Sequence, residues 1–366
     1  MKRIGFIVLA VLLVLTMFVG CNKQAEESSI KSETPTNEKP TENSTVSEES
    51  DTTSEELADS SVEQPEGYPM QDIRWIVPAP AGAALDLPSR VLANLLDLGA
   101  NVVVENIGGG SQTIGTAAAV TREADGYTLL TMANACAFTQ PLMNELAYQL
   151  SDFRKIVMLA PFVQGGVVVK ADSEIQDIDD WLELLSSGES YSYGVTNAGG
   201  FGHMSIASTL SQLGYYGDKN GVMVVYNGSA NNIAALLSGE PDFIIADATD
   251  VISHVEAGEV RVITILHNEK SALFPDAPII SDYGVENMST FVGMKWISVR
   301  KDTPEDIVAW LKQELNKTIQ TEEYQQYMNN MGFGNLREYT EEEINEIIAT
   351  AVKDYGDVMK TTGIID

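Results

Sequence analysis

A glycine-rich loop is the first feature of this sequence that could do chemistry. The stretch VVVENIGGGSQTIG places three consecutive glycines, Gly108 to Gly110, between an apolar run and residues suited to a helix. This order predicts a strand, a tight loop and a helix N-terminus, where free backbone N–H groups bind anions. The lysine of a phosphate-binding P-loop is absent, and Thr113 stands where a dinucleotide loop has its third glycine. The loop therefore favours a small anion over a nucleotide cofactor.

Residues for catalysis or metal binding do not form a recognisable set. The sequence has no G-x-S-x-G nucleophile motif, and its three histidines, His203, His254 and His267, lack the spacing of metal ligands. Cys136 is the one cysteine of the chain's body, and we expect it to be a small buried residue. We therefore expect a binding protein with no catalytic residues, no metal and no cofactor.

The elements that position these loops alternate between strands and helices. Apolar runs such as IRWIV, GVMVVY and VRVITI alternate with segments of helical periodicity such as LDLPSRVLANLL. This alternation predicts an α/β protein with mostly parallel sheets. Ligands of such sheets lie beyond the carboxyl ends of the strands. The loops at these ends are 79–86, 106–113, 133–137, 196–203, 226–231 and 246–250.

Two series of strands and helices predict two lobes with a cleft between them. The expected crossings between lobes lie at Val169 to Asp172 and near Thr290. Residues 67–169 and 290–366 are thus assigned to lobe 1, and residues 170–289 to lobe 2. The last part of the chain is expected to be mainly helical.

The charge of the chain excludes one class of partner. A net charge of −31 argues against nucleic-acid binding, which requires clustered lysine and arginine. It also argues against docking on anionic lipid through basic patches.

The N-terminus has the pattern of an export signal. Lys2 and Arg3 precede a short apolar stretch that ends in Gly20 and Cys21. Residues 1–20 resemble a bacterial lipoprotein signal peptide, with Phe18 where leucine is usual; this resemblance implies lipidation of Cys21 and anchoring on the extracytoplasmic face of the cell membrane. An uncleaved membrane anchor is the alternative. Residues 21–66 are rich in Ser, Thr, Glu and Pro, and are expected to form a disordered acidic tether.

An ordered series of motifs resembles the substrate-binding proteins of tripartite tricarboxylate transporters, the Bug or TctC family. The series comprises YPMQDIRWIVPAPAGAALD, VVVENIGGGSQTIG, ADGYTLL, SYGVTNAGGFGHM, VVYNGSANNIAALLSGEPDFIIAD and FPDAPIISDYGV. The resemblance covers Tyr68 to the C-terminus. It implies a type II periplasmic-binding-protein fold, whose two lobes and hinge enclose a ligand cleft, and an organic acid as ligand, delivered to membrane transporter subunits.

The resemblance also implies the ligand-binding residues, and Asn134 is added from the loop 133–137. They are Ala81, Gly82, Ala83, Ala84, Asp86, Gly109, Gly110, Ser111, Gln112, Thr113, Asn134, Asn197, Gly199, Gly200, Phe201, His203, Tyr226, Gly228 and Asp247.

Several of these positions depart from the family pattern. Gly82-Ala83-Ala84 replaces three glycines, Gly200-Phe201-Gly202 replaces Thr-Ser-Ser, and Asn227 replaces a lysine. Gln112 and Phe201 could therefore shape a different pocket. The loss of hydroxyls and a cation leaves open an amino acid or an uncharged solute as ligand. A sensor module of the same fold and a secreted enzyme also stay open, and Asp86 and Asp247 could instead be helix caps or loop-fixing residues.

Overall fold

The structure is a computed structural model that describes residues 61–217, 220–331, 333 and 336–366. The predicted signal peptide, Cys21 and nearly all of the predicted tether lie outside these residues. The described part forms one compact unit of the chain. None of its helices combines the length and the apolar character needed to cross a membrane.

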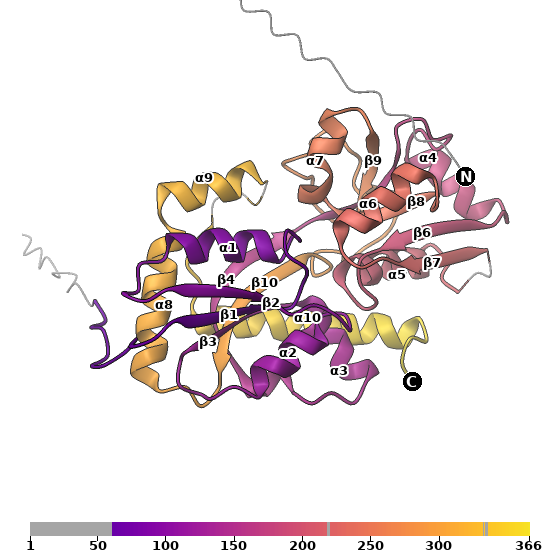
Figure 1. Ribbon diagram of the computed structural model, residues 1–366. Coiled ribbons are helices and arrows are strands. Elements are labelled where there is room, and N and C mark those ends of the chain that lie inside the picture. The colour runs from indigo at the N-terminus through magenta and orange to yellow at the C-terminus, as the bar shows by residue number, and fades with distance from the viewer. Residues whose placement is uncertain (1–60, 218–219, 332, 334–335) are drawn as a thin grey trace, which may run out of the picture. The chain divides into compact units, whose positions relative to one another are not determined.

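The first lobe is built on a five-stranded sheet of order β2-β1-β3-β10-β4 (Figure 1). Its strands are β1 (Ile73–Val77), β2 (Val102–Asn106), β3 (Thr128–Ala133), β4 (Phe153–Val163) and β10 (Gly293–Arg300). Strand β1 is parallel to β2 and β3, whereas β10 is antiparallel to β3 and β4.

The second lobe repeats this arrangement in a sheet of order β7-β6-β8-β5-β9. Its strands are β5 (Gly165–Lys170), β6 (Tyr191–Val195), β7 (Gly221–Val225), β8 (Phe243–Asp247) and β9 (Val260–Ile265). Strand β6 is parallel to β7 and β8, and β5 is antiparallel to β8 and β9. In each sheet the strand that arrives from the other lobe is thus the antiparallel one.

Helices connect and cover the strands. In the first lobe they are α1 (Asp86–Leu95), α2 (Thr113–Val120), the π-helical segment η1 (Ala135–Thr139), α3 (Gln140–Met143) and η2 (Leu150–Asp152). In the second lobe they are α4 (Ile178–Ser186), α5 (Phe201–Gln212), α6 (Ser229–Ser238), α7 (Ala248–Glu256) and η3 (Ile280–Tyr283). The chain ends with α8 (Glu305–Ile319), α9 (Glu322–Asn330) and α10 (Glu341–Thr361), which confirms the predicted helical end.

One crossing between the sheets differs from the prediction. The chain leaves the first sheet after Val163 and enters the second at Gly165, whereas the sequence pattern predicts this crossing at Val169 to Asp172. Residues 165–169, assigned above to lobe 1, belong to β5, which pairs with β8 and β9 instead. An apolar run predicts a strand but does not indicate which sheet it joins.

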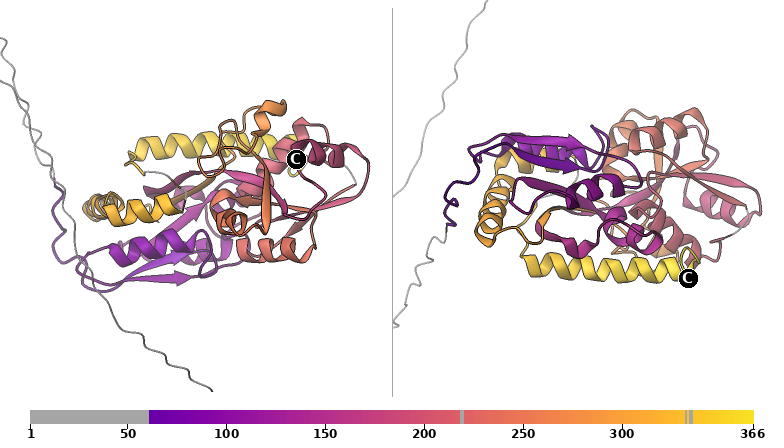
Figure 2. Two further views of the ribbon diagram at one scale, coloured as in Figure 1. Left: turned by 90° about the horizontal axis from the view of Figure 1, so that it is seen from above. Right: turned by 60° about the horizontal axis from the view of Figure 1, so that its bottom comes forward.

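Large aromatic side chains fill the cores of both lobes. Trp75 and Trp296 are fully buried in the first sheet, and Trp181 is fully buried on α4 of the second lobe. Helix α10 contacts β4 and η1 of the first lobe and also α5 of the second, and it extends along both lobes in Figure 2. Two sheets of equivalent order joined by two crossings confirm the expected two-lobed type II fold.

Candidate ligand-binding site

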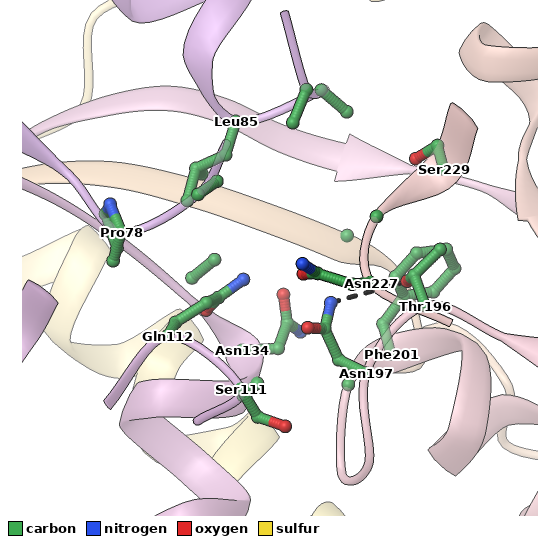
Figure 3. Close-up of a pocket in the computed structure, with 18 of the residues that line it drawn as sticks. Pro78, Leu85, Ser111, Gln112, Asn134, Thr196, Asn197, Phe201, Asn227 and Ser229 are labelled. Carbon is green, nitrogen blue, oxygen red and sulfur yellow. Dashed lines mark hydrogen bonds between the residues drawn. The ribbon is translucent and has the colours of Figure 1, made fainter. Parts of the chain in front are cut away.

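A cavity of about 420 Å³ lies where loops of both sheets meet (Figure 3). Its volume falls within the range of about 300–1,000 Å³ that is typical of small-molecule sites. It is lined by the loops after β1, β2, β3, β6 and β7, by the last residue of β8 and by the first residues of β10. The carboxyl ends of parallel strands thus form the cavity, as the sequence predicts for a ligand site.

Six helical segments begin at this cavity. The residues that precede α1, α2, η1, α5, α6 and α7 all line it: Leu85, Gln112, Asn134, Gly200, Gly228 and Asp247. No side chain caps any of these N-termini. By contrast, Asp177, Thr321 and Thr340 cap α4, α9 and α10, which begin elsewhere. The N–H groups of Asp86, Thr113 and Ala248, at the starts of α1, α2 and α7, already donate to nearby carbonyls. The first turns of α5 and α6 therefore offer the donors, and all these helices offer positive ends, to an anion.

The glycine-rich loop approaches the cavity in an unusual backbone conformation. Gly109, Gly110, Ser111 and Gln112 all have positive φ values, of 112°, 57°, 50° and 76°. Positive φ at Ser111 and Gln112 is costly for residues with a side chain, and such strain gathers at binding sites. The Oε1 atom of Gln112 is buried and has no hydrogen-bond partner among the described residues. The loop therefore brings both backbone and side-chain polar groups to the cavity wall.

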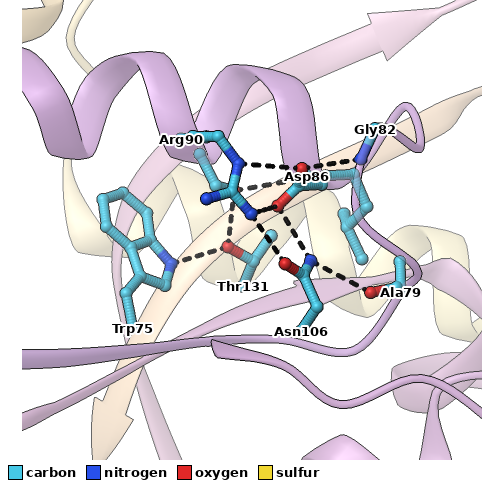
Figure 4. A network of polar contacts seen from close by, with 9 residues as sticks. Trp75, Ala79, Gly82, Asp86, Arg90, Asn106 and Thr131 are labelled. Atoms are coloured by element: carbon cyan, nitrogen blue, oxygen red, sulfur yellow. Dashed lines mark hydrogen bonds and ion pairs between the residues drawn. The ribbon is translucent and has the colours of Figure 1, made fainter. Parts of the chain in front are cut away.

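Asp86 has the loop-fixing role rather than a place in the cavity wall. Its carboxylate accepts hydrogen bonds from the Gly82 N–H at 2.8 Å, from Arg90 at 2.7 Å and from Asn106 at 2.8 Å (Figure 4). Burial acts to raise the pKa of Asp86, but the hydrogen bonds from Arg90, Gly82 and Asn106 outweigh it and hold the pKa below its ordinary value. The Asn106 amide also donates to the Ala79 carbonyl at 3.1 Å. Asp86 thus ties the loop after β1 to the end of β2.

His203 does not line the cavity, but it fixes Gly199 in a loop whose neighbouring residues do. Its Nδ1 accepts a hydrogen bond from the Gly199 N–H at 2.9 Å, so the neutral ring carries its proton on Nε2. Burial lowers the pKa of His203 to about 4. The Gly199 carbonyl in turn accepts a hydrogen bond from the Thr139 hydroxyl of the first lobe at 2.7 Å. Gly199 is therefore held from both lobes.

Charged groups line one wall of the cavity. Asp247, at the end of β8, lies with its Oδ2 3.9 Å from the Nζ of Lys295 on β10. Burial and the nearby Asp250 raise the pKa of Asp247 to about 7, while Lys295 acts in the opposite direction. Burial likewise raises the pKa of Asp250, against a hydrogen bond from Ser229 and the charge of Lys295. This wall joins the two lobes through opposite charges.

The structure brings most of the predicted site residues together. Those that line the cavity are Ala83, Ala84, Gly109, Gly110, Ser111, Gln112, Asn134, Asn197, Gly200, Phe201, Tyr226, Gly228 and Asp247. Those that do not line it are Ala81, Gly82, Asp86, Thr113, Gly199 and His203. Asp86, Gly199 and His203 act through their neighbours, as described above. Whether the lining residues bind the ligand is taken up below as a proposal.

Other lining residues were not singled out from the sequence. They include Pro78, Thr196, Ser229, Met294 and Lys295. Lys295 places a cation in the cavity wall that the motif series did not indicate. Its sequence signal was weak, because one lysine in the run FVGMKWISVR resembles a residue on the solvent face of a strand.

The described residues contain no cluster of three or more His, Cys, Asp or Glu side chains that could hold a metal ion. Cys136 is fully buried, and burial raises the pKa of its thiol. It lies in the apolar core of the first lobe, as the sequence predicted.

Comparisons with known proteins agree with the motif series. The family model of the tripartite tricarboxylate transporter family receptor, TctC, matches residues 89–364. Protein BugT of Bordetella pertussis is 29% identical over 262 residues, which cover 69% of this chain and 78% of BugT.

Solved structures show the same fold. MatC from Rhodopseudomonas palustris, solved with bound malate, has 18% identity and a TM-score of 0.72, and the match covers 80% of this chain and 99% of that protein. Another R. palustris protein, solved with adipate, has 20% identity and a TM-score of 0.73, over 81% of this chain and 98% of its own. Because the TctC model matches most of the chain, the protein belongs to the tripartite tricarboxylate transporter receptor family.

Proposed function

We propose that the protein is an extracytoplasmic receptor that binds a small organic acid and delivers it to a membrane transporter of the tripartite tricarboxylate type. The convergence of helix N-termini from both lobes on one cavity carries this proposal, because it presents positive helix ends, and N–H donors at α5 and α6, to a carboxylate. The family is one of receptors rather than enzymes. Two proteins of the same fold, solved with malate and with adipate, support a dicarboxylate of this size.

The carboxylate would be bound by the loop Gly109 to Gln112 from the first lobe and by the N-termini of α5 and α6 from the second. Contacts from both lobes would stabilise the closed form, so the ligand would shift an equilibrium between open and closed forms. Anchoring through Cys21 would keep the receptor at the membrane that holds the transporter.

A thermal-shift screen of the purified full chain tests the binding step. The panel contains malate, adipate, succinate, citrate, benzoate, glutamate and glucose. A ligand present at 100 times its Kd should add about 2.7 kcal/mol to the free energy of unfolding. We expect stabilisation by at least one carboxylate, followed by a saturable calorimetric titration with no change in the ligand. Stabilisation by glucose alone, or turnover of a bound acid, would contradict the proposal.

A pair of variants in the loop after β1 links the binding to the cavity. Ala84 lines the cavity, whereas Ala81, in the same loop, is exposed and does not. We expect Ala84→Phe to fill part of the cavity and weaken carboxylate binding by at least about tenfold, equivalent to about 1.4 kcal/mol. Ala81→Phe should bind like the parent. Equal affinities of the two variants would place the ligand elsewhere.

A further inference from the structure

Lys295 is a buried cation whose ammonium group has no hydrogen-bond partner among the described residues. The residue is only 5% exposed, and it lines the cavity. The nearest ion-pair contact is Asp247 Oδ2 at 3.9 Å, which is too long for a hydrogen bond. The ring of Phe333 lies 5.2 Å from Nζ and supplies only a weak cation–π contact. A buried ammonium needs acceptors, and a ligand in the cavity that Lys295 lines could supply them.

Two carboxylates share the surroundings of this ammonium. Asp247 and Asp250 both lie at the start of α7, and Lys295 acts electrostatically on both. Burial raises the pKa values of both acids, that of Asp247 to about 7. Near neutral pH Asp247 therefore gains or loses a proton, which changes the charge of this group by one.

The remaining groups near Asp247 do not add a cation. From α10, the phenol of Tyr355 interacts with it, and burial keeps that phenol protonated by raising its pKa. From the loop before α6, Tyr226 lines the same cavity, and burial also raises the pKa of its phenol. From β5, Gly165 pairs with Asp247 through the backbone only. Lys295 is thus the cationic side chain that the described residues place in the wall of the cavity.

We propose that Lys295 selects a carboxylate as ligand. The ligand carboxylate forms an ion pair with Lys295 in place of Asp247, and Asp247 takes up one proton from solvent. This inference rests on the proposed function and adds the residue that determines charge selectivity. An amine would meet the ammonium of Lys295 and the positive N-termini of α5 and α6 at the same cavity. A carboxylate matches those groups, but it would repel an ionised Asp247, so the anion and the proton bind together.

The sign of the pH dependence follows from this coupling. Below about pH 7 Asp247 holds its proton, and an anion binds without repulsion from this side chain. Above that pH each bound carboxylate must bring a proton, so affinity falls by up to about tenfold per pH unit. The neutral diamide of the same acid should show no such dependence.

The test measures binding of succinate and adipate, and of their neutral diamides, by calorimetry. Wild type is titrated between about pH 6.5 and pH 8.5, and in HEPES and Tris at about pH 7.5 to count protons taken up. Lys295→Met removes the cation, Asp247→Asn removes the proton site, and Lys301→Met is the control, since Lys301 is exposed just after β10. Circular dichroism and thermal unfolding show whether each variant is folded.

We expect Lys295→Met to weaken diacid binding by at least about 30-fold and diamide binding by less than about threefold. Asp247→Asn should bind the diacid with no pH dependence and more tightly than wild type at about pH 8.5. Wild type itself should take up close to one proton, a readout that requires no variant.

Three outcomes would overturn the inference. The first is a diacid affinity of Lys295→Met equal to that of Lys301→Met. The second is diacid binding by wild type without proton uptake. The third is proton uptake that survives in Asp247→Asn but disappears in Asp250→Asn, which would assign the proton to the neighbouring acid. If no carboxylate binds wild type in any condition, the proposed function itself fails, and that result is distinct from these three.

Discussion

At the scale of single residues, a neutral histidine holds the loop between the lobes. The Nδ1 of His203 accepts the Gly199 N–H, and burial lowers the pKa of His203 from 6.5 to about 4. In the unfolded chain the ring gains its proton near pH 6.5, whereas in the folded chain it does so only near pH 4. Between these values the unfolded state binds more protons, so this residue makes stability fall as pH falls.

We therefore expect His203→Gln to flatten the acid side of the stability profile. Glutamine keeps an acceptor for the Gly199 N–H but cannot be protonated. Between about pH 7 and pH 4, wild type should lose about 3 kcal/mol more of its free energy of unfolding than the variant does. Urea unfolding at several pH values measures this difference.

The raised pKa of Asp247 makes stability change with pH in the opposite direction, but this effect is present in both proteins and cancels. His254→Gln, at a partly exposed histidine paired with Glu259, serves as the control. Parallel profiles of wild type and His203→Gln would refute this role.

At the scale of elements, the two strands that cross between lobes make room for an aromatic ring. Gly165 begins β5 and Gly293 begins β10. A Cβ atom at Gly165 would lie 2.6 Å from Phe201 Cε2, and one at Gly293 would lie 3.6 Å from Phe201 Cδ1. Phe201 is the first residue of α5 and lines the cavity. The absence of a side chain at Gly165 therefore allows the ring to occupy its place in the cavity wall, whereas the contact at Gly293 is of ordinary van der Waals length.

We expect Gly165→Ala to cost about 1–3 kcal/mol of stability, because the Phe201 ring must move. In a Phe201→Ala background most of that cost should disappear, which gives a coupling energy above about 1 kcal/mol in a double-mutant cycle. Gly166→Ala is the matched control. Its Cβ would meet the backbone oxygen of Thr264 at 2.8 Å, a clash that Phe201→Ala cannot relieve. Additive effects of Gly165→Ala and Phe201→Ala would show that the ring does not depend on this glycine.

The sequence predicted the elements better than their assembly. Periodicity indicated the alternating strands and helices, and the motif series placed the glycine-rich loop and Asp247 at the cavity. The sequence pattern could not indicate that the strand 165–170 joins the second sheet, because that choice depends on pairing partners far along the chain. Lys295 was missed for a related reason. Its neighbours Met294 and Trp296 are buried as it is, and only the meeting of β10 with β8 gives it a functional setting.

At the scale of the whole molecule, direct hydrogen bonds join the two lobes near the cavity. The Thr139 hydroxyl of η1 donates to the Gly199 carbonyl at 2.7 Å, and the Gln140 amide donates to the Ala198 carbonyl at 2.9 Å. Thr139 is fully buried, and a Cβ atom at Gly199 would lie 2.3 Å from its Oγ1. The two lobes therefore approach closely at this point, behind the loop that lines the cavity.

We expect Thr139→Val to favour release of the ligand, because valine keeps the shape of threonine but leaves the Gly199 carbonyl without its donor from the other lobe. Loss of such a buried hydrogen bond costs about 1–3 kcal/mol. If the cost falls on the closed form, the off-rate of a bound carboxylate should rise about five- to tenfold or more, with little change in the on-rate. Stopped-flow measurements with the carboxylate found in the screen separate the two rates.

Thr318→Val is the matched control, since the buried Thr318 hydroxyl donates to the Glu314 carbonyl within α8 at 2.8 Å. A similar off-rate in both variants would mean that ligand contacts alone, rather than this contact between lobes, determine how long the closed complex lasts.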